Sequence, residues 1–183
     1  MRSSIYYLPG HGGSLTNGLG QALTNRGFEV TGRETIGEFR RLRFSEQLEI
    51  VADDLQSAFW KPEARVIANS FGAYLFLNAQ RLLPPYVGWV LLLSPIIGDF
   101  SNETMRMGFV PPHAGKLMEL AETGTYAPPT RCEIHVGAQD WQSDPESVKR
   151  WAGMLQIPTT VVPNAGHVLD KAYVSSLLDR WLA

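Results

Sequence analysis

Cysteine is almost absent from this sequence, because Cys132 is the only one among its 183 residues. A single thiol cannot form a disulfide within the chain, and it excludes metal sites built on paired cysteines. A chain of this length buries roughly 70% of its unfolded surface, so its core needs no disulfide. We therefore expect one domain spanning residues 1–183, in a reducing compartment, with the cytoplasm as the default location.

Runs of one charge and long apolar runs are also missing. The formal net charge is -2, and the densest basic stretch contains only Arg40, Arg41 and Arg43. We interpret these three arginines as a solvated surface loop, since no aromatic ladder accompanies them, and we expect no nucleic-acid partner. The apolar runs at 5–8 and 87–93 are too short for a signal-peptide core and for a membrane span, respectively.

Short apolar runs alternate with helical patterns along the chain. This alternation is typical of a mostly parallel sheet built from strand–helix units, with helices on both faces. Apolar residues recur at helical spacing from Phe44 to Phe59, and again from Val174 to Trp181 at the end of the chain. We expect an α/β three-layer sandwich of about six strands, at 5–8, 28–31, 66–69, 87–93, 133–136 and 159–162.

The segment 98–129 differs from the rest of the chain. It contains two proline pairs and four glycines, and it shows no clear strand pattern. We expect loops and one or two short helices here. Because the segment follows the carboxyl end of a predicted strand, it should lie over a site at that edge as a small cap or lid. An ordinary crossover helix with loose connections is the alternative.

The stretch 65–73 carries the strongest motif. An apolar strand enters a small-x-Ser-x-Gly turn formed by Ala68, Ser70 and Gly72, and a helix follows. Such a turn is typical of a nucleophile elbow, in which the serine hydroxyl projects above the sheet and the next N–H lies at a helix N-terminus. Small residues are needed because the strand and the helix approach closely. Ser70 is therefore the candidate nucleophile, although Ala68 replaces the glycine more usual at the first position.

A serine hydroxyl needs a base, and His167 is the candidate. It follows the last predicted strand, at an edge from which a histidine can reach Ser70. The acid that orients this base should lie between the two in the chain, and Asp140 follows the strand 133–136. Asp144 is better explained as the N-cap of the following helix, and Asp99, one strand earlier, is the weaker candidate.

The glycine-rich stretch 9–14, after the first strand, would bring backbone donors close to a developing oxyanion. We expect the N–H groups of His11 and Phe71 to form this oxyanion hole, with the His11 imidazole incidental. These glycines do not predict nucleotide binding, because no Lys-Ser or Lys-Thr pair follows them and the Gly18–Gly20 pair lacks a third glycine. His113 and His135 have no partner at ligand spacing, so we expect no metal and no cofactor.

These residues resemble the α/β-hydrolase superfamily. The stretch 9–13 is similar to its oxyanion loop, with Pro9 in place of a histidine, and the elbow and Gly166-His167 match as well. Because no leading hairpin is expected, the chain looks most like the small retinoblastoma-binding serine hydrolases, and cutinase-like enzymes are similarly small. The resemblance implies acyl transfer without a cofactor: Ser70 attacks an ester, thioester or amide carbonyl, and His167 moves the proton.

Two functions follow from this reading. The first is a carboxylesterase-like serine hydrolase acting on a small or medium acyl substrate through Ser70, His167 and Asp140. The second is a binding or scaffold protein that kept the fold without turnover, suggested by Ala68 and by the three candidate acids. The natural substrate and the oligomeric state stay open, although the apolar residues between Met105 and Val110 suggest an acyl-binding wall.

Overall fold

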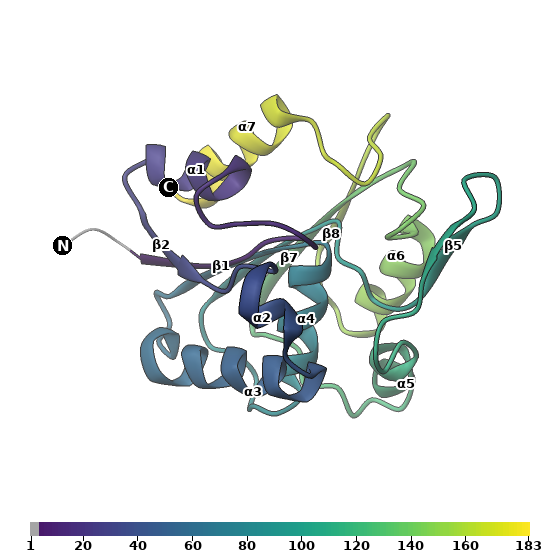
Figure 1. The fold of residues 1–183 in the computed structure, drawn as a ribbon, viewed down its shortest axis with the longest axis horizontal. Coiled ribbons are helices and arrows are strands. Elements are labelled where there is room, and N and C mark those ends of the chain that lie inside the picture. Colours follow the sequence, from purple (N-terminus) through teal and green to yellow (C-terminus); the bar gives the residue numbers. More distant parts are fainter. Residues whose placement is uncertain (1–3) are drawn as a thin grey trace.

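Six parallel strands form the centre of the molecule in the computed structural model, which describes residues 4–183 (Figure 1). Each strand pairs in parallel with its neighbours. This sheet confirms the predicted fold class and all six predicted strands. In spatial order the strands are β2 (Glu29–Gly32), β1 (Ser4–Leu8), β3 (Arg65–Asn69), β4 (Trp89–Leu93), β7 (Arg131–Gly137) and β8 (Thr159–Val162).

Helices cover both faces of this sheet (Figure 1). The inner strands are apolar on both sides for this reason: in β1, Tyr6 and Leu8 join the larger hydrophobic core, whereas Ile5 and Tyr7 join the smaller one. The smaller core lies under α1 (Gly18–Asn25) and α7 (Lys171–Trp181). The opposite face carries α2 (Gly37–Arg41), α3 (Phe44–Asp54), the π-helical turn η1 (Leu55–Phe59), α4 (Phe71–Gln80), α5 (Lys116–Glu122) and α6 (Pro145–Met154).

The segment 98–129 contains a β-hairpin that the sequence did not predict. Strands β5 (Phe100–Asn102) and β6 (Met107–Phe109) pair antiparallel, with Phe100 opposite Phe109 and their ring centroids 5.7 Å apart. Strands of three residues are too short to show an alternating pattern, which is why the prediction of a segment without strands was wrong. The short helix α5 agrees with the expected helical content. The hairpin projects at the edge of the molecule beyond α6 (Figure 1).

Within residues 4–183, no helix combines the length and the apolar character needed to cross a bilayer.

Gly72 allows α4 to leave β3 directly beside β1. A Cβ atom at this position would collide with the carbonyl groups of Leu8 and Pro9, which are backbone atoms and cannot rotate away. We expect Gly72→Ala to lower the free energy of unfolding by about 1–3 kcal/mol in a denaturant titration. Gly153, in α6, is the matched control, because an added Cβ there meets nothing within 4 Å. Gly153→Ala should be stabilising by about 0.5–1 kcal/mol, and equal effects of the two changes would contradict the predicted crowding.

Candidate active site

Ser70 lies at the sharp turn between β3 and α4. Its backbone has φ 52° and ψ -117°, a conformation that costs a non-glycine residue on the order of 1–3 kcal/mol. The surroundings hold it there: its N–H donates to the Leu93 carbonyl at 2.9 Å, and its carbonyl accepts from the Tyr74 N–H at 3.2 Å. The residue is 8% exposed. The turn therefore has the backbone expected of a nucleophile elbow.

His167 lies in the loop between β8 and α7, and its Nε2 is 2.7 Å from Ser70 Oγ. The loop is held at both ends. Before the histidine, the Ala165 carbonyl accepts from the Gln139 N–H at 2.8 Å, which ties this loop to the one that follows β7. After it, the Asp170 carboxylate caps α7 by accepting from two backbone N–H groups. The imidazole is thus positioned by the backbone as well as by its side-chain partners.

Asp140 lies in the loop after β7, with both carboxylate oxygens 3.0 Å from His167 Nδ1. Its Oδ1 also accepts from the N–H groups of Gln142 and Ser143, each at 2.9 Å, and its side chain is fully buried. Because an ionised carboxylate only accepts hydrogen bonds, the His167 proton belongs on Nδ1. Nε2 is then free to accept the Ser70 proton. The structure thus joins Ser70, His167 and Asp140 in one hydrogen-bonded series.

The structure does not bring the other two candidate acids to the histidine. Asp144 is exposed, and its carboxylate accepts from the Ser147 N–H at 2.9 Å, which makes it the N-cap of α6 as predicted. Asp99 is exposed in the loop before β5. Among the residues described, only Asp140 has a carboxylate within hydrogen-bond distance of His167.

The two predicted oxyanion donors lie on either side of the turn. Phe71 is the first residue of α4, and His11 follows β1 in a loop that passes close to Ser70: a Cβ added to Gly10 would lie 3.2 Å from Ser70 Cβ. Within residues 4–183, neither the His11 N–H nor the Phe71 N–H donates to another backbone group. Both N–H groups therefore remain available to a ligand.

The loop around His11 is held by Thr35. The Thr35 hydroxyl donates to the Gly10 carbonyl and accepts from the Gly13 N–H at 3.0 Å. The backbone adds two further bonds, from the Gly12 N–H to the Thr35 carbonyl at 3.3 Å and from the Thr35 N–H to the Gly13 carbonyl at 3.1 Å. These bonds fix the backbone on both sides of His11 before any substrate binds.

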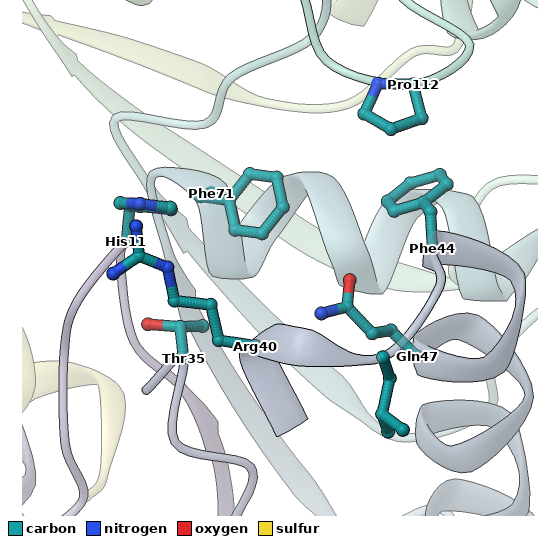
Figure 2. A pocket seen from close by; sticks show the side chains of 8 residues that line it. His11, Thr35, Arg40, Phe44, Gln47, Phe71 and Pro112 are labelled. Atoms are coloured by element: carbon teal, nitrogen blue, oxygen red, sulfur yellow. The ribbon is translucent and has the colours of Figure 1, made fainter. Parts of the chain in front are cut away.

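A pocket of ≈ 220 Å³ lies beside these donors (Figure 2). Sequence reasoning did not identify this pocket, because its walls come from separate elements, namely the loops after β1 and β2, α2, α3, the start of α4 and the segment after β6. Arg40 and Arg41 form the end of α2, so the prediction that they lie in a loop was wrong, although both are exposed as expected. The residues used below are His11, Arg40, Phe44, Gln47, Phe71 and Pro112.

The segment predicted as a cap contacts the site. The Phe109 ring, at the end of the hairpin, meets the Phe71 ring edge-on at a centroid distance of 6.1 Å. The Tyr74 hydroxyl in α4 donates to the Pro112 carbonyl at 2.7 Å. The Phe100 ring packs against Trp141, which directly follows Asp140. The base of the hairpin therefore adjoins the residues on both sides of the site.

The two remaining histidines, His113 and His135, lie outside the hydrogen-bonded series of Ser70, His167 and Asp140. His135 is 3% exposed in β7, with Nδ1 2.6 Å from the Tyr173 hydroxyl and Nε2 3.4 Å from a Glu133 oxygen. Burial lowers its pKa, as expected for a packed histidine. His113 lies edge-on against Phe44. In the described part of the chain, no three His, Cys, Asp or Glu side chains gather as potential ligands of one metal ion.

No family model matches this sequence, and no curated protein matches it. Solved structures do match the fold. The ydeN gene product of Bacillus subtilis is 13% identical, with a TM-score of 0.66 over 98% of both chains. Carboxylesterase CesB (YbfK) of B. subtilis is 14% identical with a TM-score of 0.68, and naproxen esterase of the same organism is 16% identical with a TM-score of 0.67. Each of these two matches covers 100% of this chain and 84% of the other. At such identities the similarity shows a shared fold, and this chain therefore has the same α/β architecture as these proteins, two of which are esterases.

Proposed function

We propose that this protein is a serine hydrolase that cleaves carboxylic esters or related acyl bonds. One observation carries the proposal: Ser70 Oγ, on a strained turn, lies 2.7 Å from His167 Nε2, whose Nδ1 is held by the buried Asp140 carboxylate. A hydroxyl paired with an oriented imidazole in this way is the arrangement that activates a serine.

The reaction divides into two steps. Ser70 Oγ attacks the substrate carbonyl carbon while His167 Nε2 takes the hydroxyl proton, and the carbonyl oxygen becomes an oxyanion. The bond to the leaving oxygen then breaks as His167 returns the proton to it, leaving an acyl-serine. Water repeats the sequence: His167 takes a proton from water, the resulting hydroxide attacks the acyl carbon, and the proton returns to Ser70. Asp140 stays ionised and stabilises the imidazolium formed in each step.

The backbone N–H groups of His11 and Phe71 are the proposed donors to the oxyanion. Both are unused by the described backbone, and the Thr35 bonds hold the loop on either side of His11. Donors that are already fixed cost no reorganisation during the reaction, and loss of one such donor commonly lowers the rate about 100-fold or more. No cofactor or metal ion takes part in the proposed mechanism.

Two structural neighbours are a carboxylesterase and a naproxen esterase, which favours an ester over an amide as the scissile bond. The β5–β6 hairpin and the segment that follows it, within 98–129, are the proposed cap over the acyl group, because Phe109 and Pro112 adjoin Phe71 and Tyr74. The single cysteine agrees with a reducing, cytoplasmic location. The specific likeness to retinoblastoma-binding serine hydrolases stays a prediction from the sequence.

Labelling with a fluorophosphonate, followed by mass spectrometry of the adduct, tests the proposal. We expect the purified protein to be modified at Ser70, because the reagent reacts with activated serines. His167→Ala should lower the labelling rate on the order of 100-fold or more, since the hydroxyl loses its base. Circular dichroism should show that the variant is folded. An unmodified Ser70 in folded wild-type protein would overturn the proposal and favour the binding or scaffold protein.

A further inference from the structure

We propose that the pocket beside His11 and Phe71 binds the acyl group of the substrate, and that Arg40 selects acyl groups that carry an anionic group. This inference rests on the proposed function. It adds a substrate class, the esters of acids with a second, ionised carboxyl group, and it names the residue that distinguishes them from neutral esters.

The position of the pocket relative to the reacting groups assigns it to the acyl chain. In the tetrahedral intermediate, the carbon carries Ser70 Oγ, the oxyanion, the leaving oxygen and the acyl chain. The leaving oxygen must face His167, which protonates it, and His167 does not line the pocket. The pocket lies instead on the side of the two proposed oxyanion donors, so the substituent that enters it is the acyl chain.

The walls of the pocket are largely apolar. Phe44 and Phe71 present their rings, and Pro112 closes the space above them (Figure 2). Gln47 adds a buried polar group: it is 6% exposed, its Nε2 donates to the Phe39 carbonyl at 2.8 Å, and its Oε1 points into the pocket (Figure 2). A plain alkyl chain would remove water from this oxygen without replacing the hydrogen bond, which costs about 1–3 kcal/mol. The pocket therefore fits a chain with polar character better than a plain hydrocarbon.

The charge of the pocket is positive and uncompensated. Its side chains include Arg40 and no Asp or Glu, and in the described part of the chain Arg40 forms no ion pair. The guanidinium extends along the pocket toward His11 (Figure 2). The His11 pKa is lowered by burial and by the charge of Arg40, which favours the neutral imidazole, and neither form of a histidine carries a negative charge that could pair with the guanidinium. A carboxylate at the end of the acyl chain would supply the missing partner.

The packing of α2 on α3 anchors the backbone that carries Arg40. The Gln47 amide of α3 binds the carbonyl of Phe39, the residue before Arg40, and Phe39 packs against the larger core. Arg41 belongs to the same helix and is also exposed, but it does not line the pocket. Arg41 is therefore a matched control: it carries the same charge on the same helix, but its side chain does not line the pocket.

The test compares two esters whose acyl chains have the same length, mono-4-nitrophenyl adipate, which carries a terminal carboxylate, and 4-nitrophenyl hexanoate, which is neutral. The quantity measured is the ratio of kcat/KM for the adipate ester to kcat/KM for the hexanoate ester. We expect Arg40→Gln to lower this ratio on the order of 5-fold at low ionic strength, in keeping with an exposed ion pair. Arg41→Gln should leave it unchanged, and added salt should reduce the wild-type ratio toward that of Arg40→Gln.

The outcomes are separable. Hydrolysis of the hexanoate ester with the same ratio in wild type and Arg40→Gln would overturn this inference and leave the proposed function standing. If Arg41→Gln lowered the ratio of kcat/KM values as much as Arg40→Gln does, the inference would also be overturned, because the selectivity would then come from the net charge of α2. If wild type hydrolysed neither ester and Ser70 resisted fluorophosphonate, both proposals would fail together. Thermal unfolding of each variant shows whether α2 remains packed.

Discussion

Replacing Ser70 with alanine should lower kcat/KM for an ester by a factor of at least about 10⁴, because the acyl-enzyme can no longer form. The residual rate of hydrolysis should come from the oxyanion donors and from substrate binding alone. Steady-state hydrolysis of 4-nitrophenyl hexanoate measures the loss. Ser57→Ala is the matched control, since Ser57 is an exposed serine of η1, outside the proposed site, and it should retain full activity.

The same position gives a second readout. Ser70 has φ 52°, a conformation that glycine adopts without strain. Ser70→Gly should therefore abolish turnover while raising the free energy of unfolding by about 1 kcal/mol in a denaturant titration. A Ser70→Ala protein that still hydrolysed the ester at more than a tenth of the wild-type rate would rule out Ser70 as the nucleophile.

Replacing Asp140 with asparagine should lower kcat on the order of 10⁴-fold with little change in the fold. The asparagine oxygen can keep the hydrogen bonds from the Gln142 and Ser143 N–H groups, so its NH₂ group would face His167 Nδ1. A donor in that place moves the imidazole proton to Nε2, and Nε2 then cannot accept the Ser70 proton. The kinetics of ester hydrolysis measure the loss, and circular dichroism checks the fold.

Asp144 is the matched control for this change. Asp144→Ala removes the N-cap of α6, which should cost about 1 kcal/mol of stability, but it should leave kcat within about twofold. The two variants therefore separate activity from stability. A kcat of Asp140→Asn within about threefold of wild type would show that another group orients His167, and a large loss in Asp144→Ala would point to the acid that the sequence ranked second.

Strands β1, β3 and β4 could be predicted because each is an apolar run that is buried almost throughout, whereas the edge strands β2 and β8 are short and only partly buried. In β1, Ile5 and Tyr7 face one core and Tyr6 and Leu8 face the other. Its sequence is therefore a continuous apolar run, which is typical of a buried parallel strand. The β5–β6 hairpin could not be predicted, because its strands are short and partly exposed, and Phe100 and Phe109 stabilise each other only once paired. The alternation that reveals a strand needs more residues than this hairpin has.

The candidate residues of the site divide in the same way. Ser70, Asp140 and His167 each follow the carboxyl end of a predicted strand, so local pattern and chain order were sufficient to nominate them. This prediction used a general property of parallel sheets: the carboxyl ends of neighbouring strands lie at the same edge of the sheet. Chain order could not distinguish Asp140 from Asp144 and Asp99. The structure distinguishes them, because of these three carboxylates only that of Asp140 reaches His167.

By itself, the sequence determined the class of fold, the positions of the strands and the turn that carries Ser70, since these depend on local composition and on the burial of apolar runs. Only the tertiary structure decided the hydrogen-bonded order of Ser70, His167 and Asp140 and the pocket that joins Arg40 and Gln47 to Phe71. The physical reason is distance along the chain. A hydrogen bond or a pocket wall depends on separations of a few ångströms between segments tens of residues apart, and no local pattern records those separations.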